Sequence, residues 1–315
     1  MSQYADRIAR EYPVRYKPKE KEAFRLYLMG ALRELGYDPH LQHRETPLKL
    51  GGRVTNVVAG DPDAAKIIFV AHYDTGIKPL LPPLIMPTRP MTALLYMALT
   101  PVGVMLGSLV VSFAVTFALS APQWTLPFFL ILLLAALLYL RFGPAETRNL
   151  DDNTSGVAAL LETAAALTPR YRGEAAFVFL DGGVGGMSGA KGFRAKYPSA
   201  KEKPVINLNC VAQGEELLVL PGRYSRWNGE LLDAILDSFE NGEHTTVFLK
   251  TDGIVYYPSD NRAFRQSVAL CGCNKVRGFG RLIRPRKAEC IDEEHITIIK
   301  NGLCKLIANY QPSSK

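Results

Sequence analysis

Residues 149–162 read Asn-Leu-Asp-Asp-Asn-Thr-Ser-Gly-Val-Ala-Ala-Leu-Leu-Glu, a polar turn followed by an apolar run. Asp and Asn are favoured at helix starts, and the Ala- and Leu-rich run after them predicts a helix over 154–167. The next hydrophobic run, 175–180, predicts a strand. A polar turn, a helix and a strand in this order are typical of an α/β protein.

The same alternation extends outward from this stretch in both directions. Helices are predicted over 18–36, where Gly36 provides a stop, and over 188–197. Strands are predicted over 55–59, 66–71, 175–180 and 205–211. The run 66–71 is apolar on both faces, which favours a central place in the sheet. We therefore expect an α/β fold with a mostly parallel central sheet flanked by helices.

A long uncharged insert separates the two halves of this alternation. Residues 90–140 contain no Asp, Glu, Lys or Arg, although 21% of the whole chain is charged. A spanning helix needs about 20 apolar residues, and the segments 91–119 and 124–140 are separated by Ser-Ala-Pro-Gln. We expect a transmembrane helical hairpin over 90–140 that interrupts one discontinuous domain made of 1–89 and 141–315. The alternative is a helical hairpin buried in a soluble core.

The charges beside the insert predict its orientation. Lys78 and Arg89 precede the insert, and Arg141 and Arg148 follow it. The connecting loop is uncharged. Basic residues are retained on the cytoplasmic side of a membrane, so both flanks and the main domain are expected in the cytoplasm. The lipid bilayer is then one partner of the chain.

The composition argues against several classes of protein. The five cysteines are odd in number and form no Cys-x-x-Cys pair, which disfavours a disulfide scaffold or a zinc finger. The net charge is +7, but the basic residues are scattered rather than clustered among aromatic residues, so no nucleic-acid partner is expected. The N-terminal residues lack the apolar core of a signal peptide.

Polar residues follow the predicted strand 66–71 and open the helix after the insert. His72 and Asp74 stand at the end of the strand. Asp151 and Asp152 stand at the start of the helix. A histidine at a strand end can bind a metal when a carboxylate fixes its tautomer. A single histidine is more often an ordinary polar residue, and Asp is a common helix cap, so the residues by themselves leave both interpretations open.

Taken in chain order, these stretches resemble the co-catalytic zinc aminopeptidases of peptidase family M28. That family has His-x-Asp after a strand, then Asp-Asp-Asn-x-Ser-Gly, Asn-Leu-Asp and Ser-Asp-His. The matching stretches here are Ala71–Asp74, Asp151–Glu162, Phe177–Asp181, Ile206–Val211 and Ser259–Phe264. The resemblance implies the family's α/β fold. It also implies that His72 and a bridging Asp151 would be metal ligands, with Asp74 orienting His72.

The departures from the family pattern concern its chemistry. The family's pair of glutamates, a general base and then a zinc ligand, falls on Gly183 and Val184. Neither side chain can accept a proton or bind a metal. The Asp that would hold one zinc is Asn209, a neutral amide. By this comparison no catalytic residue remains, and no zinc pair is expected to bind.

The remaining family positions are the late histidine and the cleft. No histidine lies between His244 and His295, so the late ligand is expected to be lost near 284–289. His295 belongs to a predicted helix beyond that point and is expected at the surface. Five residues are expected to line the former cleft: Asp152, Asn153, Tyr257, Asp260 and Asn261.

Two functions compete on these observations. The preferred one is a membrane-anchored, catalytically inactive pseudopeptidase that binds a protein or peptide partner without a cofactor; nicastrin and nicalin in the wider family are an analogy. The alternative is an active metal-dependent aminopeptidase or hydrolase with a remodelled site. Such an enzyme would use zinc, retain His72, Asp74 and Asp151, and recruit Cys210, Cys290 or Asp260.

A third function, nucleotide binding, rests on the glycine loop 182–189. The loop lies between a strand and a helix, close to a dinucleotide fingerprint. Asp181 stands at the position of the first glycine, and its carboxylate would repel a pyrophosphate. A tight turn in the space left by the missing glutamates is the simpler interpretation.

Overall fold

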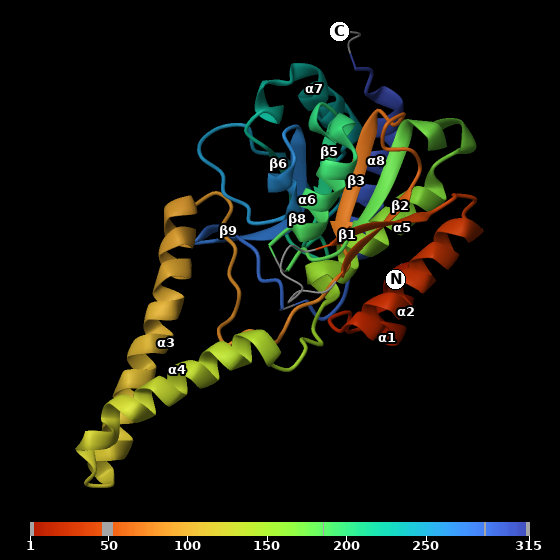
Figure 1. The fold of residues 1–315 in the computed structure, drawn as a ribbon. Coiled ribbons are helices and arrows are strands. Elements are labelled where there is room, and N and C mark those ends of the chain that lie inside the picture. Colours follow the sequence, from red (N-terminus) through yellow and green to blue (C-terminus); the bar gives the residue numbers. More distant parts are fainter. Residues whose placement is uncertain (1–2, 46–52, 185, 287, 313–315) are drawn as a thin grey trace.

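A mixed sheet forms the centre of the molecule, with helices on both faces and a helical hairpin projecting from one side (Figure 1). The computed structural model describes residues 3–45, 53–184, 186–286 and 288–312. This architecture is the α/β fold class predicted from the sequence.

The sheet has nine strands in the described part of the chain. They are β1 (His40–Glu45), β2 (Arg53–Ala59), β3 (Ile67–His72), β4 (Ala175–Leu180), β5 (Val205–Leu208), β6 (Glu216–Pro221), β7 (Thr246–Leu249), β8 (Ser267–Val276) and β9 (Gly280–Leu282). Their order is β1-β2-β4-β3-β5-β8-β6-β7, with β9 beside β8. The central strands β4, β3, β5 and β8 are parallel, so their carboxyl ends meet at one edge.

The flanks of the sheet depart from this parallel centre. The pairs β1–β2, β2–β4, β6–β8 and β8–β9 are antiparallel. Hydrophobic periodicity predicts where a strand lies but carries no information on its direction, so the sequence could not indicate these reversals.

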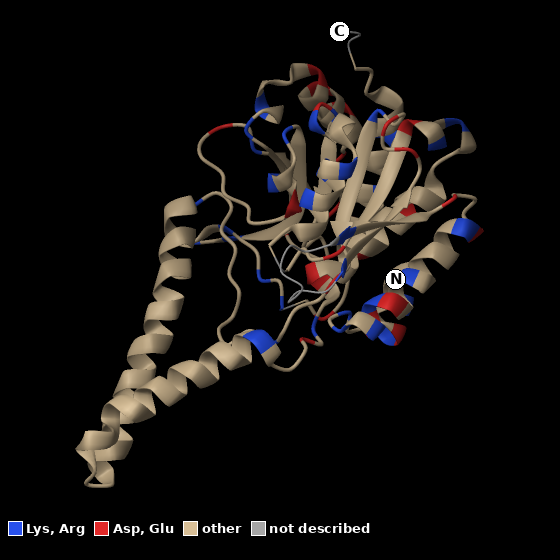
Figure 2. Ribbon diagram, in the orientation of Figure 1, with Lys and Arg blue, Asp and Glu red and all other residues tan. Residues whose placement is uncertain are grey.

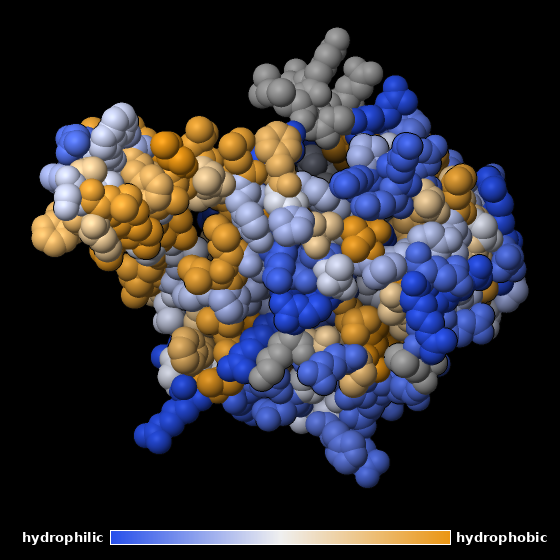
Figure 3. Space-filling view, turned by 90° about the horizontal axis from the view of Figure 1, so that it is seen from below, coloured by the Kyte–Doolittle hydropathy of each residue, from blue (hydrophilic) through white to orange (hydrophobic). Residues whose placement is uncertain are grey.

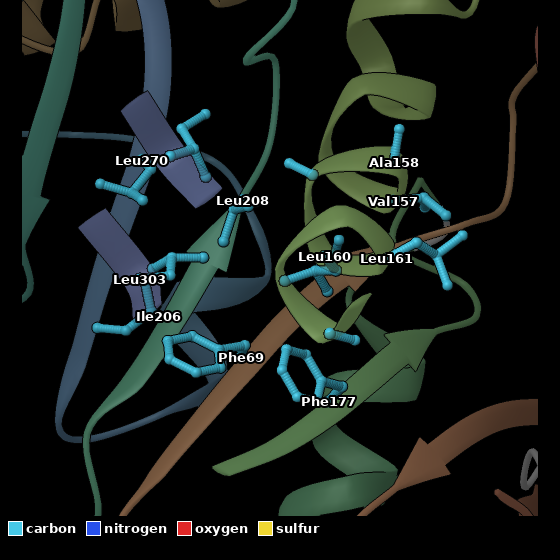
Figure 4. Close-up of a cluster of buried hydrophobic side chains, with 14 of the residues drawn as sticks. Phe69, Val157, Ala158, Leu160, Leu161, Phe177, Ile206, Leu208, Leu270 and Leu303 are labelled. Carbon is cyan, nitrogen blue, oxygen red and sulfur yellow. The ribbon is translucent and has the colours of Figure 1, made fainter. Parts of the chain in front are cut away.

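Six helices pack around the sheet in the described residues: α1 (Gln3–Glu11), α2 (Pro18–Glu34), α5 (Gly156–Ala166), α6 (Ser188–Lys196), α7 (Gly229–Ser238) and α8 (Glu293–Asn309). The larger core lies on the face covered by α5 and α8, where Leu160 and Leu303 meet Phe69 and Phe177 (Figure 4). The side chains of α6 form a second core on the opposite face. Alternate residues of β3 enter the two cores, as the two-residue period of a strand requires.

The uncharged insert forms two long helices, α3 (Pro90–Ala118) and α4 (Thr125–Phe142), joined by a 3₁₀ turn (Pro122–Trp124). Both helices are long and apolar enough to cross a membrane. Their charged residues lie only near the ends that join the domain (Figure 2). Viewed from below, apolar surface gathers on the hairpin (Figure 3).

The hairpin does not behave as a helical pair buried in a soluble core. None of the most apolar window of either helix is buried. Large side chains such as Phe117 and Leu134 are 71% and 56% exposed, respectively. Water-soluble proteins rarely leave so large a continuous apolar surface uncovered.

Candidate functional site

The carboxyl edge of the parallel strands brings the candidate residues together. His72 is the last residue of β3, and Asn209 directly follows β5. The helical turn Leu150–Ser155, which precedes α5, carries Asp151 and Asp152. Carboxyl ends of neighbouring parallel strands are where α/β proteins place their ligand sites.

His72 is buried between two carboxylates. Its Nδ1 lies 3.1 Å from the backbone oxygen of Asp74 and 3.5 Å from a carboxylate oxygen of the same residue. Its Nε2 lies 3.1 Å from Oδ1 of Asp152. Burial alone would lower the pKa of His72, but the hydrogen bonds to Asp152 and Asp74 outweigh it and raise the pKa well above 6.5. These hydrogen bonds favour the protonated form of the His72 ring.

Arg286 supplies a second cation at the same place. A guanidinium nitrogen lies 2.9 Å from Oδ2 of Asp152, and another donates to Oδ1 of Asn149 at 2.8 Å and to the backbone oxygen of Asp152 at 3.0 Å. Burial opposes ionisation of Asp152, but the hydrogen bond from His72 and the charge of Arg286 lower its pKa to about 2. The carboxylate of Asp152 is thus ionised and shared between two protein cations.

Asp151 makes its side-chain hydrogen bond outside this cluster. Its Oδ1 accepts a hydrogen bond of 2.9 Å from the backbone N–H of Ala212. Burial raises the pKa of Asp151 to about 8, against the smaller effect of that hydrogen bond. The family pattern predicted that Asp151 would join His72, whereas the structure brings Asp152 to it. Asp152 has non-helical backbone angles, so neighbouring side chains of this turn project to different sides.

The position of the missing general base is closed by His72. A Cβ added at Gly183 would lie 2.6 Å from both Cβ and Cγ of His72 and 3.0 Å from Oδ2 of Asp260. The backbone N–H groups of Gly183 and Val184 donate to the carboxylate of Asp74 at 2.8 and 3.3 Å. The loop that would carry two glutamates therefore binds a carboxylate through its backbone instead.

The same hydrogen bonds bear on the glycine loop 182–189. Its first two amides after Gly182 are used by Asp74, so they are not available to a phosphate. Asp181 is buried and accepts from Lys21 at 2.6 Å and from the N–H of Thr55 at 3.1 Å. These contacts favour a structural turn over a nucleotide site.

Amide side chains fix the rest of the former cleft. Asn209 donates to Oγ of Ser259 at 3.0 Å, and the hydroxyl of Tyr257 donates to the backbone oxygen of Asn209 at 2.8 Å. Asn153 donates to the backbone oxygen of Leu208 at 2.9 Å. The predicted cleft residues are therefore brought together, but largely in contacts within the protein.

Asp260 and Asn261 complete this set. Both carboxylate oxygens of Asp260 are buried and have no hydrogen-bond partner in the described part of the chain. Burial raises the pKa of Asp260 to about 6. Asn261 is also buried, and its Oδ1 has no partner among the described residues.

The donor set does not fit a pair of zinc ions. No group of three or more His, Cys, Asp or Glu side chains that could hold a metal ion occurs among residues 3–45, 53–184, 186–286 and 288–312. The carboxylate of Asp152 already pairs with His72 and Arg286. A zinc ion at this place would have to compete with Arg286 and His72 for the same carboxylate.

Two of the prominent residues were not identified from the sequence. Arg286 lies in the segment 284–289, where the family's late histidine was expected to be lost. A basic residue in place of that metal ligand is the signal that could have identified Arg286 as a partner of the carboxylates. Arg15 is fully buried and donates to the backbone oxygen of Tyr73 and to Oγ1 of Thr154. Burial lowers its pKa to about 10. No local pattern indicates this role for Arg15.

His295 is not the surface residue expected from the sequence. It is fully buried on α8, and its Nε2 lies 2.8 Å from the backbone oxygen of Gly214. That prediction was wrong because α8 packs the face that carries His295 against the sheet. The acidic residues 292–294 directly before His295 had suggested an exposed position.

The comparisons with known proteins concern sequence and fold. A sequence model described as Peptidase family M28 matches residues 141–272. No curated protein sequence matches the chain.

Three solved structures are similar in fold. A glutaminyl cyclase of Bacteroides thetaiotaomicron has 15% identity and a TM-score of 0.56, covering 98% of this chain and 96% of that one. A leucine aminopeptidase precursor of the same organism has 15% identity and a TM-score of 0.56, with 98% and 95% covered. A Zn-dependent exopeptidase of Parabacteroides distasonis has 14% identity and a TM-score of 0.56, with 99% and 98% covered.

Proposed function

Because the chain resembles peptidase family M28 in sequence over 141–272 and in fold, we propose that it is an aminopeptidase-like protein that has lost catalysis. In this proposal it is a pseudopeptidase, anchored in a membrane by the hairpin, that binds a protein or peptide partner there. Its main domain lies in the cytoplasm.

The observation that carries the proposal is the pairing of Asp152 with Arg286 and His72. Two side-chain cations already balance the carboxylate that faces His72. A divalent cation entering this place would have to displace the guanidinium of Arg286 from Asp152, which opposes binding. The missing carboxylates at Gly183, Val184 and Asn209 support the same conclusion.

The anchoring is supported by the apolar surface and by the flanking charges. α3 and α4 expose almost their whole length, and the uncharged turn between them lies far from the domain (Figure 2). Lys78, Arg89, Arg141 and Arg148 stand on the domain side of the hairpin. An even number of spanning helices returns the chain to the side on which it began, so both halves of the domain share one compartment.

The test is a detergent pull-down of the full chain, with metal analysis and hydrolysis assays on the same preparation. We expect co-purification of a defined protein, no stoichiometric zinc, and no turnover of aminoacyl or short peptide reporters. Stoichiometric zinc, or turnover that is lost in Asp152→Ala, would contradict the proposal.

One observation favours the second candidate, a remodelled hydrolase. A cavity of about 340 Å³ lies beside Asp151 and is lined by Glu289 and Cys290 among other polar residues. The pKa of about 8 at Asp151 suits a group that exchanges protons near neutral pH. This enzyme would lose turnover in Asp151→Ala and retain it in Asp152→Ala, which separates it from the pseudopeptidase and from an ordinary family member.

A further inference from the structure

A larger cavity shares Tyr257 and Asn261 with the former cleft and extends from there over another part of the surface. Its volume is about 740 Å³, and it lies between the segment that follows β6, the segment 253–257 and the start of β8. Ligand sites in proteins range from about 300 to 1,000 Å³, so the cavity is large enough for several side chains of a partner.

Four arginines line this cavity: Arg223, Arg226, Arg262 and Arg265. None of the described residues that line it is Asp or Glu. In the part of the chain that the structure describes, Arg265 alone of the four makes an ion pair, with Glu202 at 3.3 Å, and both side chains are more than half exposed. An exposed pair of this kind neutralises little charge. The cavity therefore presents a concentrated positive charge.

Aromatic rings and backbone oxygens hold these arginines in position. The guanidinium carbon of Arg262 lies 4.9 Å from the ring centre of Tyr256, and that of Arg265 lies 4.9 Å from the ring centre of Tyr224. Arg226 donates to the backbone oxygen of Gly253 at 2.6 Å. A positioned guanidinium loses less side-chain entropy when it binds a carboxylate than a mobile one does.

The rim of the cavity is apolar and uncovered. Trp227 and Ile254 are 87% and 79% exposed. Trp, Tyr and Arg are the residues most enriched at the energetic centres of protein interfaces, and all three types meet here. A partner segment with a large apolar side chain between two acidic residues would complement these apolar residues and the arginines beside them.

The cavity wall is attached to the membrane hairpin. The backbone N–H of Tyr256 donates to the backbone oxygen of Pro87 at 3.0 Å, and α3 begins at Pro90. A segment seated in the cavity would therefore lie beside the domain end of the hairpin.

We propose that this cavity binds an acidic peptide segment of a partner protein, one that carries an aromatic or large aliphatic side chain between Asp or Glu residues. The arginines select the carboxylates, and Trp227 with Ile254 contacts the apolar side chain. The inference rests on the proposed function only in taking the partner to be a protein.

The two tryptophans of the chain allow a direct measurement. Trp124 belongs to the hairpin, so Trp124→Phe in the full chain leaves Trp227 as the sole tryptophan reporter. The probe is the peptide Glu-Asp-Phe-Glu-Asp with both ends blocked, and its neutral match is Gln-Asn-Phe-Gln-Asn. We expect a saturable change in Trp227 fluorescence with the acidic peptide alone, and we expect it to weaken as salt is added.

Variants connect the signal to the arginines. Arg262→Gln should weaken binding about tenfold, because a charge-assisted hydrogen bond is lost. Arg262→Lys should recover part of the affinity, which excludes misfolding as the cause. The matched control is Arg170→Gln, because Arg170 is an exposed arginine over Tyr171 at 5.5 Å on another surface. It should leave binding unchanged.

Several outcomes would overturn the proposal. They are the absence of a saturable change, equal binding of both peptides, and an affinity that Arg262→Gln does not alter. Phosphatidylserine vesicles that displace the peptide, and whose binding needs Arg262, would assign the cavity to a lipid surface instead.

Hydrolysis of the acidic peptide would contradict the pseudopeptidase and leave the cavity assignment intact. Partner capture that survives Arg262→Gln, without peptide binding, would remove the cavity assignment alone.

Discussion

The guanidinium of Arg286 and the ring of His72 hold Asp152 from two sides. At the scale of single residues, these two contacts hold the largely buried carboxylate of Asp152 between side chains of the protein itself. A buried ion pair contributes little net stability, but removing one partner leaves the other charge buried and unpaired. The cluster is therefore sensitive to single substitutions.

Arg286→Met tests this pairing. We expect a loss of about 3 kcal/mol in the free energy of unfolding, because Asp152 keeps its charge without its guanidinium partner. Denaturant unfolding of the purified full chain in detergent measures it. The double variant with Asp152→Asn should cost less than the sum of the two single variants; strict additivity would show that the two residues do not interact.

Gly183→Ala tests the closed general-base position. The added methyl group would lie 2.6 Å from Cβ and Cγ of His72, so we expect a loss of about 2 kcal/mol from overpacking. The control is Gly229→Ala, where an added Cβ meets no atom within 4 Å. Equal stability of the two variants in thermal unfolding would show that the position has room for a side chain.

Glu216 provides a prediction on pH. It pairs with Lys275 at 2.8 Å and with Arg281 at 2.5 Å. Burial opposes its ionisation, but these cations lower its pKa below 4.5. A lowered pKa stabilises the fold above pH 4.5, and the gain disappears as the pH falls through the folded-state value.

Glu216→Gln should therefore lower the free energy of unfolding by about 2 kcal/mol at neutral pH, and the difference should shrink below about pH 4. Unfolding midpoints at several pH values check this. The control is Asp233→Asn, at an exposed position of α7. If the two chains, with and without Glu216→Gln, differed in free energy of unfolding by the same amount at every pH, Glu216 would not have the lowered pKa.

At the scale of elements, the hairpin is the part whose sequence differs most from the rest. α3 and α4 take no part in the two main hydrophobic cores. A hydrocarbon layer would cover their apolar side chains, and a helix satisfies its own backbone hydrogen bonds in such a layer.

Leu134→Lys tests the membrane segment. A lysine at the centre of a spanning helix costs about 3 kcal/mol, so we expect a smaller membrane-bound fraction after alkaline extraction. The control is Leu236→Lys on α7, where the native leucine is 58% exposed on the domain. Equal extraction of both variants would argue against insertion of α4.

At the scale of the whole molecule, the domain closes around the insert. β3 comes before the hairpin and β4 after it, yet they pair in parallel along their whole length. Both halves must therefore lie on one side of any membrane that the hairpin crosses.

Labelling with an impermeant maleimide tests this topology. Cys290 is exposed on the domain, and Ser120 lies in the turn between α3 and α4. We expect label at Cys290 only after the cells are permeabilised, and label on Ser120→Cys in intact cells. Cys290→Ser identifies the domain signal. Label at Cys290 in intact cells would reverse the proposed orientation.

The sequence alone predicted the α/β class, the positions of α2, α5 and α6 and of β2, β3, β4 and β5, and the apolar insert. These depend on local periodicity and on runs of apolar residues, which are properties of neighbouring positions. The resemblance to peptidase family M28 identified His72, the turn 151–156 and Asn209 as parts of one candidate site. Only the tertiary structure decided that Asp152 rather than Asp151 meets His72, that Arg286 joins them, and that His295 is buried. Those facts depend on segments more than fifty residues apart and on the backbone angles of one turn, which no local pattern encodes.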